Sequence, residues 1–410
     1  MALSVETGQF AANTGSATTT VSHSFGTTPL AIIMWTTGQT TTGSDSAANA
    51  SFSFGFSDAT NFRSIGWASD DNVGTTNCGK AFRTDRIVEV FSNGTPTTVR
   101  YVNDWNPTTT NFDVVWDGTP AAAYLVSYII IGGTDVTNVI VGTHTLDTAT
   151  GSDSVTGLAF QPDFGVFINA QATAAGTAVR ALGSIGFAAS SSKEFTMAWG
   201  IDDGATMTAT IDAVSYTNQA ACMSGITAGA ETVDFLADFT SFNSDGYTIN
   251  ISNAPPAAWL VGYLLIKGGQ WDVGTTTHAS ARTLSGMAFQ PKGIAFSFGR
   301  TTTDATVTVD QQVGFGAAAS TTTEVVGMAG QLDATLNTDV ERYTNTGNLY
   351  WRLGSSNTWV LDSFNSDGAT LSGAGSSGNQ VGWFAMGDNA APPSTLVKDI
   401  IMPGITPFAR

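Results

Sequence analysis

The chain has few charged residues and no basic cluster, and these deficits exclude several classes of protein. Of its 410 residues, 12% are charged, against about a quarter in ordinary globular domains. Lys and Arg total 15 against 33 Asp and Glu, for a net charge of −18. Proteins that bind the phosphate backbone of nucleic acid, or dock on anionic lipid, need clustered Lys and Arg. We therefore expect no nucleic-acid partner.

Cysteine, histidine and long apolar segments are also scarce. Cys78 and Cys222 fit no zinc-binding spacing, and we expect two small buried or half-buried thiols. The three histidines, His23, His144 and His278, have no repeated Ser, Cys or Asp partner, so we expect no catalytic group and no cofactor. No apolar run approaches the roughly 20 residues of a membrane-spanning helix, so we expect no membrane insertion. The first residues also lack the pattern of a secretory signal.

What the sequence does have is internal repetition. Residues 158–163 (LAFQPD) return as residues 287–292 (MAFQPK), and a divergent version holds Phe25 and Pro29. The recurring blocks also include Gly55-Phe56, Gly186-Phe187 and Gly314-Phe315, then Trp67 and Trp199, then Asn243-Ser244-Asp245-Gly246 and Asn365-Ser366-Asp367-Gly368. A period of about 120–135 residues has the size of a domain and not of a solenoid repeat. The pattern predicts three units, residues 1–134, 135–270 and 271–389, and an arm at residues 390–410.

Short segments rich in β-branched and aromatic residues, bounded by Gly, Asn, Asp and Ser, dominate every unit. This pattern predicts an all-β protein of three tandem β-sandwich or jelly-roll-like domains with a short C-terminal arm. One short helical turn is expected near residues 217–223. Because no Pro- or Ser-rich linker separates the units, we expect them to dock closely end to end.

The repeated Phe-Gln-Pro motif is predicted to be structural. Proline fixes φ and lacks an N–H, which suits the start of a strand. The phenylalanines are expected in the core, and the glutamines are expected to satisfy a backbone group. The motif residues are Phe160, Gln161 and Pro162, then Phe289, Gln290 and Pro291, and in the first unit Phe25 and Pro29.

Two pairs of acidic residues allow two interpretations. Asp70-Asp71 and Asp202-Asp203 follow a tryptophan-bearing strand, and carboxylates from one loop are ligands that Ca²⁺ prefers. The third unit keeps only Asp333 at this place. We therefore favour a turn over a metal site.

Aromatic residues of the third unit are candidates for contact with a partner or a glycan. Exposed aromatic rings flanked by polar groups stack on sugar rings or anchor protein partners. The candidates are Trp271, Trp351, Trp359 and Tyr350.

The last segment lies outside the repeat and contains four prolines. We expect it to be an extended arm that packs on a neighbouring molecule or on the preceding unit. Its apolar residues, predicted to make the assembly contacts, are Leu396, Val397, Ile400, Ile401 and Met402.

Residues 150–163, TGSDSVTGLAFQPD, resemble a strand-entry segment of bacteriophage virion proteins, found in tail-fibre-like and decoration-like β domains. Residues 241–246 and the Lys-Gly-Gly at residues 267–269 fit the same resemblance. The first unit departs from it, because it keeps only Phe25 and Pro29. The resemblance implies a fold and a setting on the particle, and no particular ligand.

From these features we expect a non-enzymatic structural protein on the exterior of a bacteriophage particle, made in the host cytoplasm. Capsid decoration is preferred over a tail or fibre component, because three similar domains in one chain mimic a trimer at a three-fold position. Its expected partners are other virion proteins, within a homo-oligomer or a larger assembly. The alternatives are a receptor-binding protein for a host-surface glycan and a secreted-type array of carbohydrate-binding modules.

Overall fold

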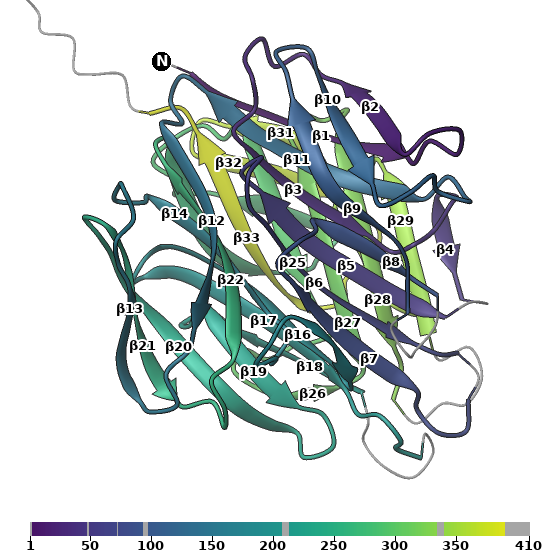
Figure 1. The fold of residues 1–410 in the computed structure, drawn as a ribbon. Helices are drawn as coiled ribbons and strands as arrows, with labels where there is room; N and C mark the ends of the chain where they lie inside the picture. Colours follow the sequence, from purple (N-terminus) through teal and green to yellow (C-terminus); the bar gives the residue numbers. More distant parts are fainter. Residues whose placement is uncertain are drawn as a thin grey trace, which may run out of the picture.

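The computed structural model describes residues 2–46, 49–71, 73–92, 97–206, 213–333 and 340–389. Throughout these residues the secondary structure is strand and turn, which confirms the all-β class (Figure 1). Within the same residues there is no helix of the length and hydropathy that a membrane span requires. The helical turn expected near residues 217–223 is wrong. There, the buried strand β18 (Ala213–Asn218) turns directly into β19 (Met223–Thr227), and the Cys222 N–H donates to Ala237 O at 3.0 Å.

The described chain forms β1–β11, β12–β22 and β23–β33, that is, eleven strands in each repeat. The first repeat contains β1 (Leu3–Ala11), β2 (Thr18–Ser22), β3 (Ala31–Thr36), β4 (Gly43–Asp45), β5 (Ala50–Ser57), β6 (Phe62–Ser69), β7 (Cys78–Arg83), β8 (Val88–Phe91), β9 (Thr98–Pro107), β10 (Asn111–Trp116) and β11 (Leu125–Gly133). The second contains β12 (Asn138–Thr145), β13 (Gly151–Val155), β14 (Phe164–Asn169), β15 (Gly176–Val179), β16 (Ala181–Ser190), β17 (Lys193–Ile201), β18, β19, β20 (Thr232–Asn243), β21 (Gly246–Asn253) and β22 (Leu260–Lys267). The third contains β23 (Gln270–Thr277), β24 (Ala281–Leu284), β25 (Gly293–Phe298), β26 (Thr308–Val309), β27 (Gln311–Ala318), β28 (Glu324–Gln331), β29 (Val340–Thr346), β30 (Tyr350–Trp351), β31 (Thr358–Asn365), β32 (Gly368–Ser372) and β33 (Gln380–Gly387).

Every repeat builds the same two antiparallel sheets. The large sheets have the orders β1-β11-β3-β5-β6-β7, β12-β22-β14-β16-β17-β18 and β23-β33-β25-β27-β28-β29, each followed by a seventh strand. The small sheets have the orders β2-β10-β9-β8, β13-β21-β20-β19 and β24-β32-β31-β30. Each small sheet packs on the large sheet of its own repeat, so that each repeat is a β-sandwich.

The seventh strand of each large sheet comes from another repeat. Strand β15 of the second repeat pairs with β7 of the first, and β26 of the third pairs with β18 of the second. Strand β4 of the first repeat closes the circle on β29 of the third, as Figure 1 shows at its right side. We call β4, β15 and β26 the exchanged strands. The sequence suggests consecutive docking, but the third repeat also packs against the first, which makes the arrangement cyclic.

Strands of the large sheets are apolar on both faces because both faces are covered. In β3, Ile32 and Met34 face the small sheet, whereas Ile33 and Trp35 belong to a core shared by all three repeats. This central core brings Phe315 of the third repeat within 4.8 Å of Phe54 of the first and 6.3 Å of Phe187 of the second, measured between ring centroids. Side chains alternate between the two faces of a strand. A run such as residues 31–35 therefore serves two cores at once.

Glycines on the fifth strand of each repeat allow the small sheet to approach closely. A Cβ at Gly55, Gly186 or Gly316 would lie about 2 Å from the backbone oxygen of Ile87, Cys222 or Leu349, respectively. The sequence predicts that Gly314 is the counterpart of Gly55 and Gly186. In the structure the counterpart is Gly316, two residues later. A shift of two residues keeps every side chain on its face of the sheet, so the apolar pattern alone does not reveal it.

Candidate functional site

The Phe-Gln-Pro motif lies where the chain enters the third strand of the large sheet. Phe160 and Phe289 are each 9% exposed, and the prolines of all three motifs are buried. The Gln161 side-chain amide donates to Phe242 O at 2.9 Å, and that of Gln290 donates to Phe364 O at 3.3 Å. These carbonyls belong to the Asn-Ser-Asp-Gly hairpins between β20 and β21 and between β31 and β32. The motif therefore ties the large sheet to a turn of the small sheet.

The repeat predicts that Phe25 is buried like Phe160 and Phe289, but Phe25 is only half-buried. It lies edge-on to His23, with 5.7 Å between ring centroids. Four positions separate Phe25 from Pro29, whereas two separate Phe160 from Pro162. The longer spacing moves the ring towards the rim of the core, although it still covers Gly132.

The paired aspartates accept hydrogen bonds that join separate loops. Asp70 accepts hydrogen bonds from the side-chain amides of Asn49 and Asn77. Asp203 of the second repeat accepts one from the Cys78 N–H of the first at 3.0 Å. Asp202 accepts one from the Gly229 N–H at 2.8 Å. In the part of the chain that the structure describes, no three His, Cys, Asp or Glu side chains gather as a metal site would require.

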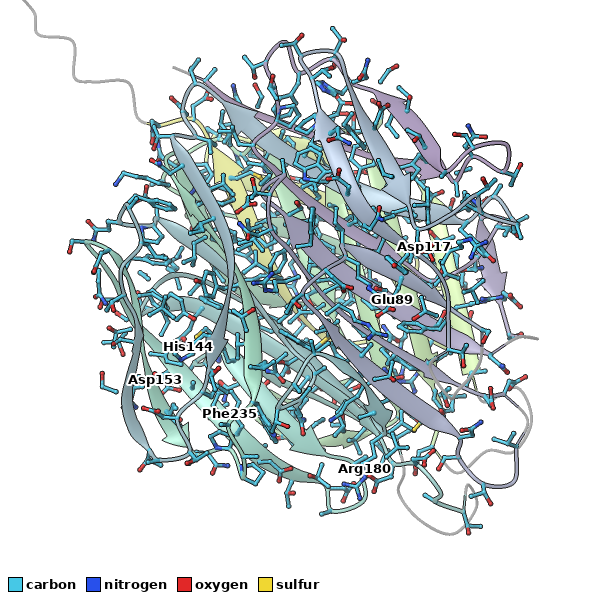
Figure 2. The ribbon with its side chains drawn as sticks, in the orientation of Figure 1. Glu89, Asp117, His144, Asp153, Arg180 and Phe235 are labelled. Atoms are coloured by element: carbon cyan, nitrogen blue, oxygen red, sulfur yellow. The ribbon has the colours of Figure 1, made fainter. Side chains whose placement is uncertain are left out.

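The histidines are engaged in packing. His144 Nε2 lies 2.7 Å from Asp153 Oδ2, with both side chains buried between β12 and β13 (Figure 2). His278 stacks on Tyr350 with 4.2 Å between ring centroids, and burial lowers the pKa of its imidazole. The sequence does not predict the pairing of His144 with Asp153, because the two residues come from different strands and no local motif joins them.

Two of the four candidate contact aromatics are core residues, which corrects the prediction of an exposed patch. Tyr350 and Trp359 are fully buried. Tyr350 lies on β30, directly opposite Trp359 on β31. Trp271 is half-buried and stacks on Phe164 of the second repeat, with 4.2 Å between ring centroids and 4° between planes. It is therefore a contact between repeats. Trp351 is half-buried, stacks on Tyr343 of its own repeat and borders a surface pocket.

Two buried glutamates are further candidate functional residues that no motif in the sequence predicts. Glu194 and Glu324 occupy equivalent positions at the start of β17 and β28 and are 6% and 4% exposed. Glu194 accepts a hydrogen bond from the Phe239 N–H at 2.7 Å, and Glu324 accepts one from the Leu361 N–H. Burial outweighs these hydrogen bonds and raises the pKa of each carboxyl to about 7. Each glutamate satisfies the backbone where the opposing strand of the small sheet changes register.

Leu3 and Asn389, near the two ends of the described chain, both lie at the junction between the first and second repeats, which we call the first repeat junction. The Leu3 N–H donates to Asp388 Oδ1 at 2.7 Å, and the Asn389 N–H donates to Asp135 Oδ2 at 2.8 Å. Asp388 also pairs with Lys292 at 2.8 Å. We call this region, formed by Leu3, Asp135, Lys292, Asp388 and Asn389, the junction pole. The arm residues Leu396, Val397, Ile400, Ile401 and Met402 lie outside the described residues.

No protein-family model matches the chain, and no curated protein matches it. Among solved structures, a similar chain is the major capsid protein P2 from bacteriophage PM2. The two share 8% identity and a TM-score of 0.20, over 65% of this chain and 98% of that one. A score of this size carries no argument about function.

Proposed function

We propose that this protein is a non-enzymatic structural component of the exterior of a bacteriophage particle. The observation that carries the proposal is the cyclic exchange of β4, β15 and β26, which joins three repeats of one chain into a single trimer-like body. An oligomer with threefold symmetry matches a three-fold position of a closed shell. The resemblance of residues 150–163 to virion β domains supports the same setting.

Attachment through the junction pole fits the path of the chain. Asn389, the last residue that the structure describes, donates a hydrogen bond to Asp135 at the first repeat junction, and its neighbour Asp388 accepts one from the Leu3 N–H. The sequence of this arm carries four prolines and five apolar residues. Fixed φ angles reduce the entropy that an extended segment loses on docking. The proposed partners are other virion proteins.

Within this class we favour capsid decoration over a tail or fibre component. A single chain with three repeats of the same topology arranged in a ring can present one repeat to each of three shell subunits. A fibre built from serial domains needs the repeats to be stacked along an axis, whereas these repeats close into a ring.

The test is attachment to particles that lack the protein. The full chain and a chain ending at residue 389 are mixed with such particles, sedimented, and imaged by electron microscopy. We expect density for the full chain at three-fold positions of the head and at least a tenfold weaker attachment of the truncated chain, as for loss of a main contact. Density on the tail would overturn decoration, and equal attachment of both chains would overturn the role of the arm.

A further inference from the structure

One surface pocket, lined mainly by the third repeat, combines an indole with a carboxylate and serine hydroxyls. It has a volume of about 430 Å³ and lies at the end of β30 and the turn after it. The third repeat supplies most of its lining, and the first repeat adds Ser46, which directly follows the exchanged strand β4. The lining residues of the third repeat include Leu332, Glu341, Trp351, Leu353, Ser355 and Ser356. The pocket therefore lies beside the pairing of β4 with β29, but the ion pair of Asp45 with Arg342 and the hydrogen bonds of the junction pole involve none of these side chains.

The indole of Trp351 is held in a fixed orientation. One of its faces stacks on Tyr343, with 3.9 Å between ring centroids and 8° between planes. Its Nε1–H donates to Glu341 Oε1 at 3.3 Å. Tyr343 is buried, and its hydroxyl accepts hydrogen bonds from the side chains of Asn345 and Asn348. A ring fixed in this way loses little conformational entropy when a ligand stacks on it.

The rest of the indole faces the pocket. Trp351 is half-buried and lines the pocket, whereas the stacking partner Tyr343 does not. Glu341 is half-buried and also accepts a hydrogen bond from the Gly354 N–H, at 2.7 Å to Oε2. A carboxylate has about four lone-pair sites, so both oxygens of Glu341 can still accept from a ligand. Ser355 and Ser356 add hydroxyl groups to the rim.

We propose that this pocket binds a neutral pyranose sugar of a surface polysaccharide. The apolar C–H face of the sugar stacks on Trp351, and adjacent sugar hydroxyls donate to Glu341 and exchange hydrogen bonds with Ser355. Anionic sugars are disfavoured, because Glu341 borders the pocket and the chain carries a net charge of −18.

Among the residues that the structure describes, the first and second repeats do not reproduce this site, since they differ at the position of Trp351. The backbone oxygens of Ile87, Cys222 and Leu349 lie over equivalent glycines, so the residues two positions later are Glu89, Ser224 and Trp351. Glu89, labelled in Figure 2, is buried. It pairs with Arg83 and Arg86, and Ser224 is buried as well. The site therefore favours a single recognition point over a repeated array of carbohydrate-binding modules.

The full-length protein is tested on a glycan array carrying glucose, galactose, mannose and N-acetylhexosamine residues, beside sialylated and uronic-acid glycans. We expect binding to at least one neutral glycan and none to the acidic ones. Trp351→Ala should weaken binding by roughly tenfold or more. Ser356→Trp, which fills the pocket from an exposed position, should abolish binding with the melting temperature unchanged. Ser154→Ala, on the exposed edge of the second repeat, serves as the matched control.

Failure to bind any neutral glycan would overturn the proposal, as would unchanged binding in both pocket variants. Preference for an acidic glycan would overturn the argument from charge. The array uses isolated protein, so these outcomes are independent of attachment to the particle.

Discussion

At the scale of single residues, the buried glutamates make stability depend on pH. The folded pKa of Glu194 and of Glu324 is raised to about 7 from an ordinary 4.5. Between these values the native state binds more protons than the unfolded state, so the free energy of unfolding falls as pH rises. The contribution of both groups is complete below about pH 4.5 and is lost as pH rises through about 7.

We therefore expect the double variant Glu194→Gln/Glu324→Gln to lose less stability than the wild type between pH 4.5 and pH 8. The difference should be on the order of 1–3 kcal/mol for each residue. Glutamine keeps an acceptor for the Phe239 and Leu361 N–H groups. Urea unfolding at several pH values measures the effect, with the exposed Glu231→Gln as control. Parallel pH profiles of wild type and double variant would show that these carboxyls do not titrate in this range.

Close backbone approach at Gly186 leads to a second prediction. A Cβ there would lie 1.9 Å from Cys222 O, a backbone atom that cannot rotate away. Gly186→Ala should lower the free energy of unfolding by about 1–3 kcal/mol or more, because β16 and the small sheet must separate. Gly74→Ala, whose Cβ would have no neighbour within 4 Å, is the matched control. Equal urea midpoints for the two variants would contradict this packing.

At the scale of elements, an ion pair reinforces the ladder that joins β4 to β29. Arg342 Nε and Nη2 both donate to Asp45 Oδ2, at 3.0 and 2.7 Å. Asp45→Asn should let β4 open more often and speed hydrogen exchange of its amides about five- to tenfold, equivalent to roughly 1 kcal/mol.

Asp85→Asn is the control for β4. It alters another Arg-carboxylate pair, that of Asp85 with Arg86, whose Asp85 side chain is 61% exposed. Asp85→Asn should leave the hydrogen-exchange rates of the β4 amides unchanged. If Asp45→Asn also leaves the hydrogen-exchange rates of the β4 amides unchanged, the ion pair does not stabilise the pairing of β4 with β29.

Local patterns predict the strands but not their partners. The apolar runs, the Phe-Gln-Pro entries and the Asn-Ser-Asp-Gly hairpins follow from period and turn chemistry. The exchanged strands β15 and β26 are only four and two residues long, and they pair with strands about 95 positions away, so no local signal marks them. Tyr350 and Trp359 look like surface aromatics in the sequence for a different reason, because polar residues such as Arg352 and Thr358 flank them, and only their pairing across β30 and β31 shows that they are buried.

At the scale of the whole molecule, the three repeats share one core. Trp35 of the first repeat packs against Phe315 of the third, with 4.9 Å between ring centroids, and fills the space above Gly327. Phe187 of the second repeat lies 4.8 Å from Phe384 of the third. A single repeat removed from this assembly would expose its side of the central core and lose its seventh strand. The ring therefore forms one body, as the proposed placement at a three-fold position requires.

The pairing of β4 with β29 is the direct test of ring closure, because it joins the first repeat to the third. Asp45 and Arg342 are opposite partners in this ladder, and opposite Cα atoms in antiparallel strands lie about 4.5–5.5 Å apart, within the range of a disulfide. Asp45→Cys/Arg342→Cys should therefore oxidise to an intramolecular disulfide and migrate faster on a non-reducing gel. Ser22→Cys/Arg342→Cys, which places the first thiol on the small sheet, should not. A pair of thiols at 45 and 342 that stays reduced under conditions of oxidation would contradict the closed ring.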